Sequence, residues 1–224
     1  MIISLIGLSG CGKSTWAQRL AQERGFKRFC CDDMIEERLH NELFSAGING
    51  IRGVAFWMGQ PYEHFFPDRQ STYLTREAGV IAEIVQTLAL NQSEEQDIVI
   101  DTTGSFVYLD PALCLSLKKH STLVYLQVPE GDVSQMFRQY LADPKPVVWK
   151  DSFNMQPGES NIQALSRCYP ELIESRIKLY QSYADVVVPV AFADRGALST
   201  DEFISKLKNA LPQHKPEGSP RLPS

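Results

Sequence analysis

Several features that would place this 224-residue chain in a membrane, in a secreted scaffold or on a nucleic acid are missing. No apolar run is long enough to span a bilayer, so we expect no membrane partner. The five cysteines form no C-x-x-C pair, which argues against a zinc site or a disulfide framework and fits a reducing compartment. A net charge of −5 argues against a nucleic-acid partner. The N-terminus has no basic segment of the kind that opens a signal peptide, and we therefore expect a cytoplasmic protein.

The length and the 43% hydrophobic content predict one domain with a sizeable core, over residues 1–211. Residues 212–224 contain four prolines, and we expect them to form a disordered tail. No internal repeat is present. The composition therefore indicates a compact enzyme-sized domain, as a monomer or a weak dimer.

Residues 7–15 read GLSGCGKST, which fits the phosphate-binding pattern G-x-x-x-x-G-K-[ST]. The apolar residues 1–6 before it predict a strand, and the helix formers of 16–24 after it predict a helix that ends at Gly25. Glycines let the backbone N–H groups of such a loop turn onto phosphate oxygens, and the helix N-terminus adds its positive dipole end. The pattern predicts ATP and Mg²⁺ as ligands, with the Lys13 ammonium at the β- and γ-phosphates and the Ser14 hydroxyl on the metal. The residues predicted to hold the nucleotide in this loop are Gly7, Ser9, Gly10, Cys11, Gly12, Lys13, Ser14 and Thr15.

Apolar segments alternate with helix-forming segments along the rest of the chain. Further strands are predicted at 26–31, 97–101, 123–128 and 185–188, and further helices at 32–43, 71–90, 110–119, 130–142, 162–183 and 200–211. Five apolar strands separated by helices predict an α/β fold, a parallel sheet with helices on both faces and ligands beyond the carboxyl ends of the strands. Residues 44–70 are expected to be an irregular, substrate-covering insertion. Residues 143–158 are expected to be a mobile lid, in which Trp149 is half-exposed.

Beyond the loop, four segments resemble the P-loop small-molecule kinases, and most of all shikimate kinase and its relatives. These segments are 32–37 (DDMIEE), 101–105 (DTTGS), Arg138 with 145–148 (KPVV), and 176–180 (RIKLY) with 184–188 (ADVVV). The resemblance implies an ATP-dependent kinase that transfers the γ-phosphoryl group to a hydroxyl of a small metabolite. It places Asp32 at the acceptor hydroxyl and Gly104 in the substrate turn. It also places Arg138 near the adenine, Lys145 in the lid and Arg176 at a substrate carboxylate.

Each of these side chains also has a simpler interpretation. Asp32 is either the base that accepts the hydroxyl proton or a helix N-cap. Asp101 ends an apolar strand, as a magnesium-binding aspartate does, or is an ordinary turn residue. Arg138 and Lys145 either close over the nucleotide or belong to a solvated helix and a linker. Arg176 binds an anionic group or forms a surface pair, and Arg76, which flanks the covering segment, is a further candidate for an anion contact.

The sequence also departs from the shikimate kinase pattern. Cys30 stands in place of the family's first aspartate, Leu74 in place of an arginine that binds the substrate carboxylate, and Thr103 and Ser105 in place of two glycines. We therefore expect shikimate to be a poor substrate. A nucleoside or nucleotide kinase is the first alternative, and a non-catalytic nucleotide-binding protein is the second. The guanine-reading pattern N-K-x-D is absent, which argues against a GTPase.

Overall fold

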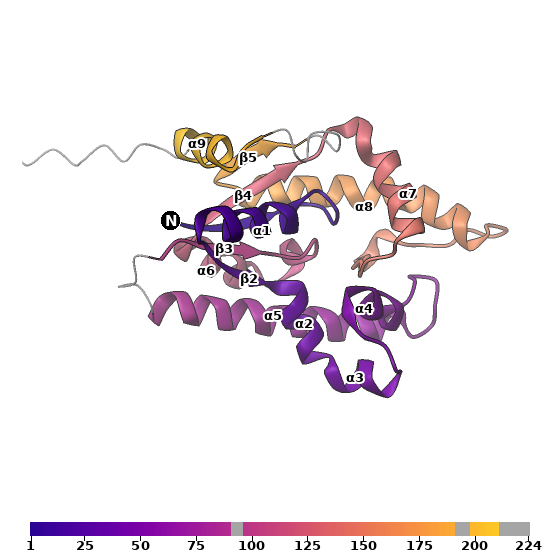
Figure 1. The fold of residues 1–224 in the computed structure, drawn as a ribbon. Helices are drawn as coiled ribbons and strands as arrows, with labels where there is room; N and C mark the ends of the chain where they lie inside the picture. The colour runs from indigo at the N-terminus through magenta and orange to yellow at the C-terminus, as the bar shows by residue number, and fades with distance from the viewer. Residues whose placement is uncertain (91–95, 191–197, 211–224) are drawn as a thin grey trace, which may run out of the picture.

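A parallel five-stranded sheet forms the centre of the molecule (Figure 1), as the alternation of segments predicts. The computed structural model describes residues 1–90, 96–190 and 198–210. The strands are β1 (Ile2–Ile6), β2 (Lys27–Cys30), β3 (Ile98–Asp101), β4 (Thr122–Gln127) and β5 (Val186–Pro189), in the order β2-β3-β1-β4-β5. The predicted tail at 212–224, and residue 211, lie outside the described residues.

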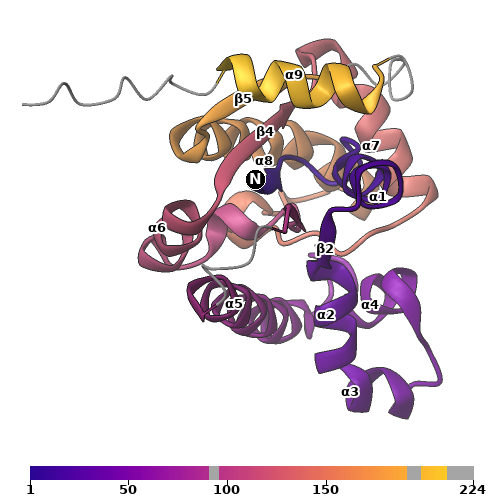
Figure 2. The ribbon, with the colours of Figure 1, turned by 60° about the vertical axis from the view of Figure 1, so that its left-hand side comes forward.

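Helices cover both faces of this sheet. They are α1 (Lys13–Arg24), α2 (Cys31–Arg38), α3 (His40–Ser45), α4 (Gly50–Met58), α5 (Phe66–Leu90), α6 (Pro111–His120), α7 (Val133–Ala142), α8 (Asn161–Tyr183) and α9 (Thr200–Ala210), with short 3₁₀ turns at Phe106–Tyr108, Glu130–Asp132 and Lys150–Ser152. Helices α1 and α9 pack on one face, and α6 and α8 on the other with α5 against α6 (Figure 2). Within the described residues, no helix combines the length and the apolar character needed to cross a membrane.

Two groups of helices extend beyond the carboxyl ends of the strands (Figure 1). One contains α2, α3 and α4, which pack against one another and against α5, and the other contains α7 with the chain that follows it. Register places the last residues of β2 and β3 side by side, because Cys30 aligns with Asp101. The segments that follow these strands therefore open into the same space, at the edge where α/β sheets bind ligands.

The segment 44–70 is more regular than predicted. The expected helix 32–43 divides at Leu39 into α2 and α3, and α4 and the start of α5 occupy much of the rest. The prediction was wrong because the glycines in and around α4 lower its helix propensity, whereas the buried residues Val54, Trp57 and Met58 recur at helical spacing and hold it against the core. Tertiary packing therefore outweighs local propensity in this segment.

The segment 143–158 has little regular structure, as predicted, but it is firmly attached to the body. Trp149, expected to be half-exposed, is only 1% exposed, because its ring packs against Tyr140, Phe153 and Tyr169. The side-chain oxygen of Gln70 on α5 accepts hydrogen bonds from the backbone N–H groups of Trp149 (2.6 Å) and Lys150 (2.9 Å). The middle of this segment is thus fixed, and it carries the preceding residues 145 and 146 toward the strand ends.

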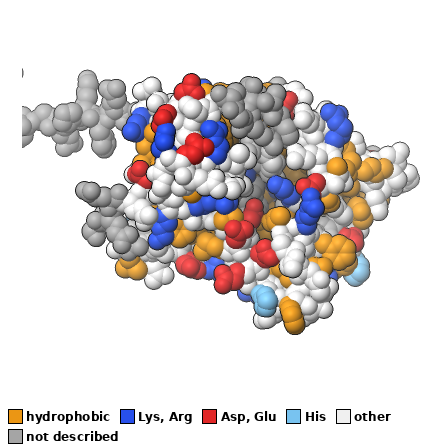
Figure 3. Space-filling model, viewed as in Figure 1, with side chains coloured by type: hydrophobic (Ala, Val, Ile, Leu, Met, Phe, Trp, Pro, Cys, Tyr) orange, Lys and Arg blue, Asp and Glu red, His pale blue; other side chains and the backbone are white. Residues whose placement is uncertain are grey.

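Charged side chains of both signs are interspersed on the face of the molecule drawn in Figure 3. Large apolar side chains also reach solvent from the helices beyond the strand ends, where Phe44 on α3 and Phe56 on α4 are each 75% exposed. On this face, side chains of the two signs are therefore mixed rather than separated.

A buried carboxyl group joins α5 to the turn after β3. Glu77 is fully buried, and its oxygens accept hydrogen bonds from the hydroxyls of Thr103 and Ser105, the latter at 2.7 Å. Burial raises the pKa of Glu77 to about 7, although both hydroxyls and the nearby Arg176 favour the ionised form. Thr103 and Ser105 stand where the shikimate kinase pattern has glycines, which have no hydroxyl to bind such a carboxyl group.

We expect Glu77→Gln to change the pH dependence of stability. Because the pKa of Glu77 is raised on folding, the folded state holds this proton more tightly than the unfolded chain does. The resulting stabilisation is complete below the unfolded pKa of about 4.5 and is lost as the pH rises through about 7. The stability of Glu77→Gln relative to the wild type should therefore increase between pH 5 and pH 8, as measured by urea unfolding. Glu37→Gln, at an exposed position of α2, is the control, and an equal response of both variants would contradict this account.

Candidate active site

The loop between β1 and α1 forms a cradle with its lysine buried inside. Gly12, the residue before α1, has a φ of +107°, a left-handed conformation that favours glycine. A Cβ at Gly7 would lie 2.9 Å from the carbonyl oxygen of Leu126 in β4, so only glycine allows the loop to approach this strand. This close approach fixes the path that the loop takes from the end of β1 past β4. Cys11 is buried in the same loop, beside Gly7.

The Lys13 ammonium is held by its own loop. Its Nζ donates hydrogen bonds to the carbonyl oxygens of Gly7 (2.8 Å) and Leu8 (2.9 Å), and the residue is only 6% exposed. These oxygens occupy positions around the ammonium that phosphate oxygens can take, since both are hydrogen-bond acceptors. The lysine is therefore held inside the cradle rather than free in solvent.

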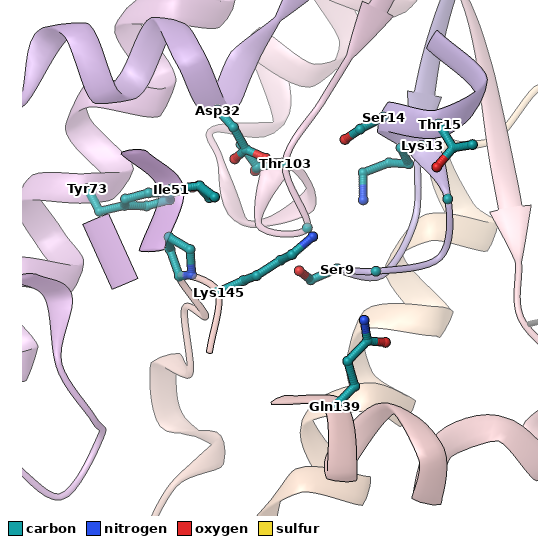
Figure 4. Close-up of a pocket in the computed structure, with 14 residues that line it drawn as sticks. Ser9, Lys13, Ser14, Thr15, Asp32, Ile51, Tyr73, Thr103, Gln139 and Lys145 are labelled. Atoms are coloured by element: carbon teal, nitrogen blue, oxygen red, sulfur yellow. The ribbon is translucent and has the colours of Figure 1, made fainter. Parts of the chain in front are cut away.

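A cavity of about 100 Å³ lies in front of the loop (Figure 4). It is lined by Ser9, Gly10, Gly12, Lys13, Ser14, Thr15, Asp32, Ile51, Tyr73, Thr103, Gly104, Gln139, Lys145 and Pro146. In Figure 4, Lys13, Ser14 and Thr15 lie on one side, and Asp32, Ile51, Tyr73 and Thr103 lie on the other. Five regions of the chain far apart in sequence therefore meet here: the loop, α2, α4 with α5, the turn after β3, and the chain around α7.

Asp32 is the carboxylate that faces the loop. It lies in the first turn of α2, directly after β2, and it lines the cavity. Burial raises the pKa of Asp32 to about 6, with a smaller contribution from the negative charge of Asp101, whereas Lys13 and Lys145 lower it. A carboxyl group with this pKa is ionised at neutral pH, and it takes up a proton more readily than an ordinary aspartate does.

Lys145 enters the cavity from the segment after α7. Figure 4 shows its side chain extended between Ser9 and Thr103, with the amine directed toward the centre. Its positive charge lowers the pKa of Asp32, against the effect of burial. Arg176 supports the same segment, since its Nη2 donates to the Val148 carbonyl oxygen at 2.5 Å. The predicted lid thus delivers a cation to the site, from a backbone that is anchored three residues further on.

Asp101, the predicted metal ligand, does not line this cavity. Its carboxylate is 3% exposed and accepts a hydrogen bond from Nη2 of Arg28 on β2, at 2.7 Å. The sequence analysis did not foresee Arg28, because the pairing depends on the register of two neighbouring strands. The negative charge of Asp101 is therefore neutralised by an arginine on the adjacent strand.

None of the three arginines assigned to ligands lines this cavity. Arg76 turns toward Glu42 of α3, at 3.2 Å, because that carboxylate lies beside its helix. Arg138 is exposed on α7, and the next residue, Gln139, lines the cavity instead. Arg176 is 2% exposed and lies directly behind Gly104, where a Cβ on the glycine would be 3.2 Å from its Nη1.

Sequence reasoning missed several residues that line the cavity. They are Ile51, Tyr73, Thr103, Gln139 and Pro146. Tyr73 lies one helical turn before Glu77 on α5, so the acidic residue and its spacing could have indicated the inner face of that helix. Ile51 had no such signal, since α4 itself was not predicted.

Comparison with known proteins identifies relatives of this chain. A family model described as "AAA domain" matches residues 2–139. The shikimate kinase of Francisella tularensis subsp. novicida is 30% identical over 187 residues, which cover 83% of this chain and 83% of that protein. A solved structure of shikimate kinase from Acinetobacter baumannii in complex with shikimate has a TM-score of 0.58 at 20% identity, over 93% of this chain and 90% of that one.

The fold is shared more widely than this. A dephospho-CoA kinase from Campylobacter jejuni has a TM-score of 0.52 at 12% identity, over 93% of this chain and 96% of that one. At such identities the structural matches show the fold alone, whereas the family match and the 30% identical relative show descent. The resemblance found in the sequence is therefore confirmed, and the chain belongs to the AAA-domain family of P-loop proteins as a member related to the shikimate kinases.

Proposed function

We propose that this protein is an ATP-dependent kinase that transfers the γ-phosphoryl group to a hydroxyl of a small metabolite. One observation carries the proposal: the loop lysine and a carboxylate with a raised pKa face the same cavity from opposite sides. Phosphoryl transfer needs little more from a protein than positioning, neutralisation of negative charge and a place for the hydroxyl proton. The ancestry of the chain supports this proposal, because its relatives are kinases of small molecules.

The residues around the loop fit a nucleotide triphosphate with Mg²⁺. The loop leads directly into the N-terminus of α1, a position at which helices bind phosphate, Lys13 supplies positive charge, and the exposed residues Ser14 and Thr15 border the cavity. Magnesium, when bound, would neutralise phosphate charge. The cavity of about 100 Å³ has room for phosphate groups rather than for a whole nucleotide and an acceptor. We therefore infer that parts of its wall move when both substrates bind. We propose 143–158 as the lid, in which the part around Lys145 moves while Trp149 stays anchored to the body.

Each charged side chain has a distinct proposed role. Lys13 would exchange the carbonyl oxygens of Gly7 and Leu8 for phosphate oxygens and stabilise the charge that develops on them. Asp32 would accept the proton of the acceptor hydroxyl as that oxygen bonds to the γ-phosphorus and the bond to the β-phosphate oxygen breaks. Lys145, which reaches the cavity centre, would neutralise negative charge on the γ-phosphoryl group during its transfer. Ser14 is the proposed metal ligand, because it borders the cavity, whereas Asp101 does not line it and is paired with Arg28.

We expect Mg²⁺ to depend on Ser14 more than on Asp101. Ser14→Ala removes a hydroxyl that borders the cavity, and we expect it to raise the Mg²⁺ concentration for half-maximal phosphoryl transfer by about tenfold. Asp101→Asn breaks the pair with Arg28, and we expect it to lower the free energy of unfolding while leaving the Mg²⁺ requirement within about twofold. Magnesium titrations of transfer, with urea unfolding of both variants, separate these effects. A larger increase of the Mg²⁺ requirement in Asp101→Asn than in Ser14→Ala would identify Asp101 as the metal ligand instead.

The pH profile of phosphoryl transfer tests the role of Asp32 and the proposed function with it. Because Asp32 acts as a base only when ionised, kcat/KM for the acceptor should rise with pH, with a midpoint near the Asp32 pKa of about 6. Asp32→Asn should lower the rate by about a hundredfold or more. The measurement follows radiolabelled γ-phosphate from ATP into hydroxyl compounds, with mass spectrometry of the products.

The matched control is Asp33→Asn, the next residue on α2, which is exposed. This variant should keep its rate, and its midpoint should fall slightly, because the charge of Asp33 raises the pKa of Asp32. A flat profile between pH 5 and pH 8, or full activity of Asp32→Asn, would exclude Asp32 as the base. Tight binding of ATP without transfer to any hydroxyl compound would favour the non-catalytic alternative.

A further inference from the structure

We propose that the cavity selects a phosphoryl acceptor without negative charge, a neutral polyol or an amino polyol rather than a hydroxy acid or a phosphate ester. The selecting surface is its acceptor side, defined here as Asp32, Ile51, Tyr73 and Thr103. This inference rests on the proposed kinase function and names its substrate class. It is carried by the charges and hydrogen-bonding groups that reach this side.

The two amines in the cavity are both placed for phosphate groups. Among the described residues that line it, the side-chain cations are Lys13, inside the loop, and Lys145, whose amine lies between Ser9 and Thr103. The polyphosphate of the nucleotide carries enough negative charge to engage both amines. Asp32 is then the charged group that remains next to the acceptor, and it repels a second anion at short range.

No guanidinium from the described part of the chain lines the acceptor side. Arg176 is the nearest candidate, but it is buried and does not line the cavity, and its Nη2 donates to the Val148 carbonyl oxygen. Arg76 reaches toward Glu42 instead. Leu74, also on α5, packs against the hydrophobic core. An acceptor carboxylate would therefore lack the bidentate partner that usually binds such a group.

The hydrogen-bonding groups on this side also favour donors over anions. The Thr103 hydroxyl donates its hydrogen to the buried Glu77 and accepts a hydrogen bond from the Ser105 backbone N–H, so it has no further hydrogen to donate and can act toward the cavity only as an acceptor. The ionised Asp32 offers only acceptor oxygens. Burial keeps Tyr73 as a neutral phenol, because it raises the pKa of that group, so Tyr73 adds no charge to this side and can donate or accept a hydrogen bond. Hydroxyl or ammonium groups of a polyol satisfy these acceptors, whereas a carboxylate adds further acceptors and a like charge.

The test compares acceptors that share a carbon skeleton and differ in charge. The probes are gluconate with glucitol and glucamine, glycerate with glycerol, and shikimate with methyl shikimate. Transfer of radiolabelled γ-phosphate to each compound gives kcat/KM, and mass spectrometry identifies the ester. Within each set that is phosphorylated, we expect the neutral or amino compound to exceed the carboxylate by at least about tenfold.

A charge placed on the acceptor side should reverse this order. Ile51 lines the cavity and carries no charge, so Ile51→Arg should raise kcat/KM for the carboxylate of a set relative to its neutral partner by about tenfold or more. Ile51→Met is the matched control, and it should keep the charge preference of the wild type whatever its effect on the absolute rate. If Ile51→Arg keeps the charge preference of the wild type, the acceptor side does not select the acceptor by its charge.

The outcomes separate this inference from the proposed function. Transfer that favours the carboxylate of a set would overturn the inference and leave the kinase function established. Failure of every compound to accept phosphate, with ATP still bound by the folded protein, would overturn both. A preference for the neutral or amino member that Ile51→Arg reverses would support both.

Discussion

The placement of the Lys13 ammonium is the constraint on which the rest of the site depends. It requires the left-handed turn at Gly12 and the close approach of Gly7 to the Leu126 carbonyl oxygen, because together they bring the carbonyls of Gly7 and Leu8 around one amine. A side chain at Gly7 would push the loop away from β4 and move the amine with it. The apolar strands therefore matter to function mainly as a rigid support for this turn.

The parallel sheet then determines which groups can face that amine. Strands β2 and β3 end side by side, so Asp32 after one and Thr103 after the other meet at the same edge as the loop. Lys145 comes from the opposite group of helices, and the buried Trp149 and the Gln70 hydrogen bonds hold its segment in place. Glu77 ties the turn at Thr103 to α5, and in doing so it also sets which hydrogen-bonding groups the cavity offers.

Much of this could be predicted where the signal was local. The loop pattern and the alternation of apolar segments were enough for the sheet, for the cradle and, with the resemblance, for Asp32 and Lys145 at the site. The direction of several charged side chains was not predictable, because each contacts a partner from a distant segment. These pairs are Arg76 with Glu42, Arg176 with the Val148 carbonyl oxygen, and Asp101 with Arg28. Helix α4 was missed for a similar reason, since packing rather than propensity forms it.

The most direct test of the account is phosphoryl transfer by Lys13→Met, because this change removes the ammonium and keeps a side chain of similar length. The measurement is the flow of radiolabel from the γ-phosphate of ATP to a hydroxyl compound that the wild type phosphorylates, with thermal unfolding as the check on folding. The account predicts an intact fold and a loss of transfer by roughly a hundredfold to a thousandfold. Transfer at the wild-type rate by the folded variant would contradict it.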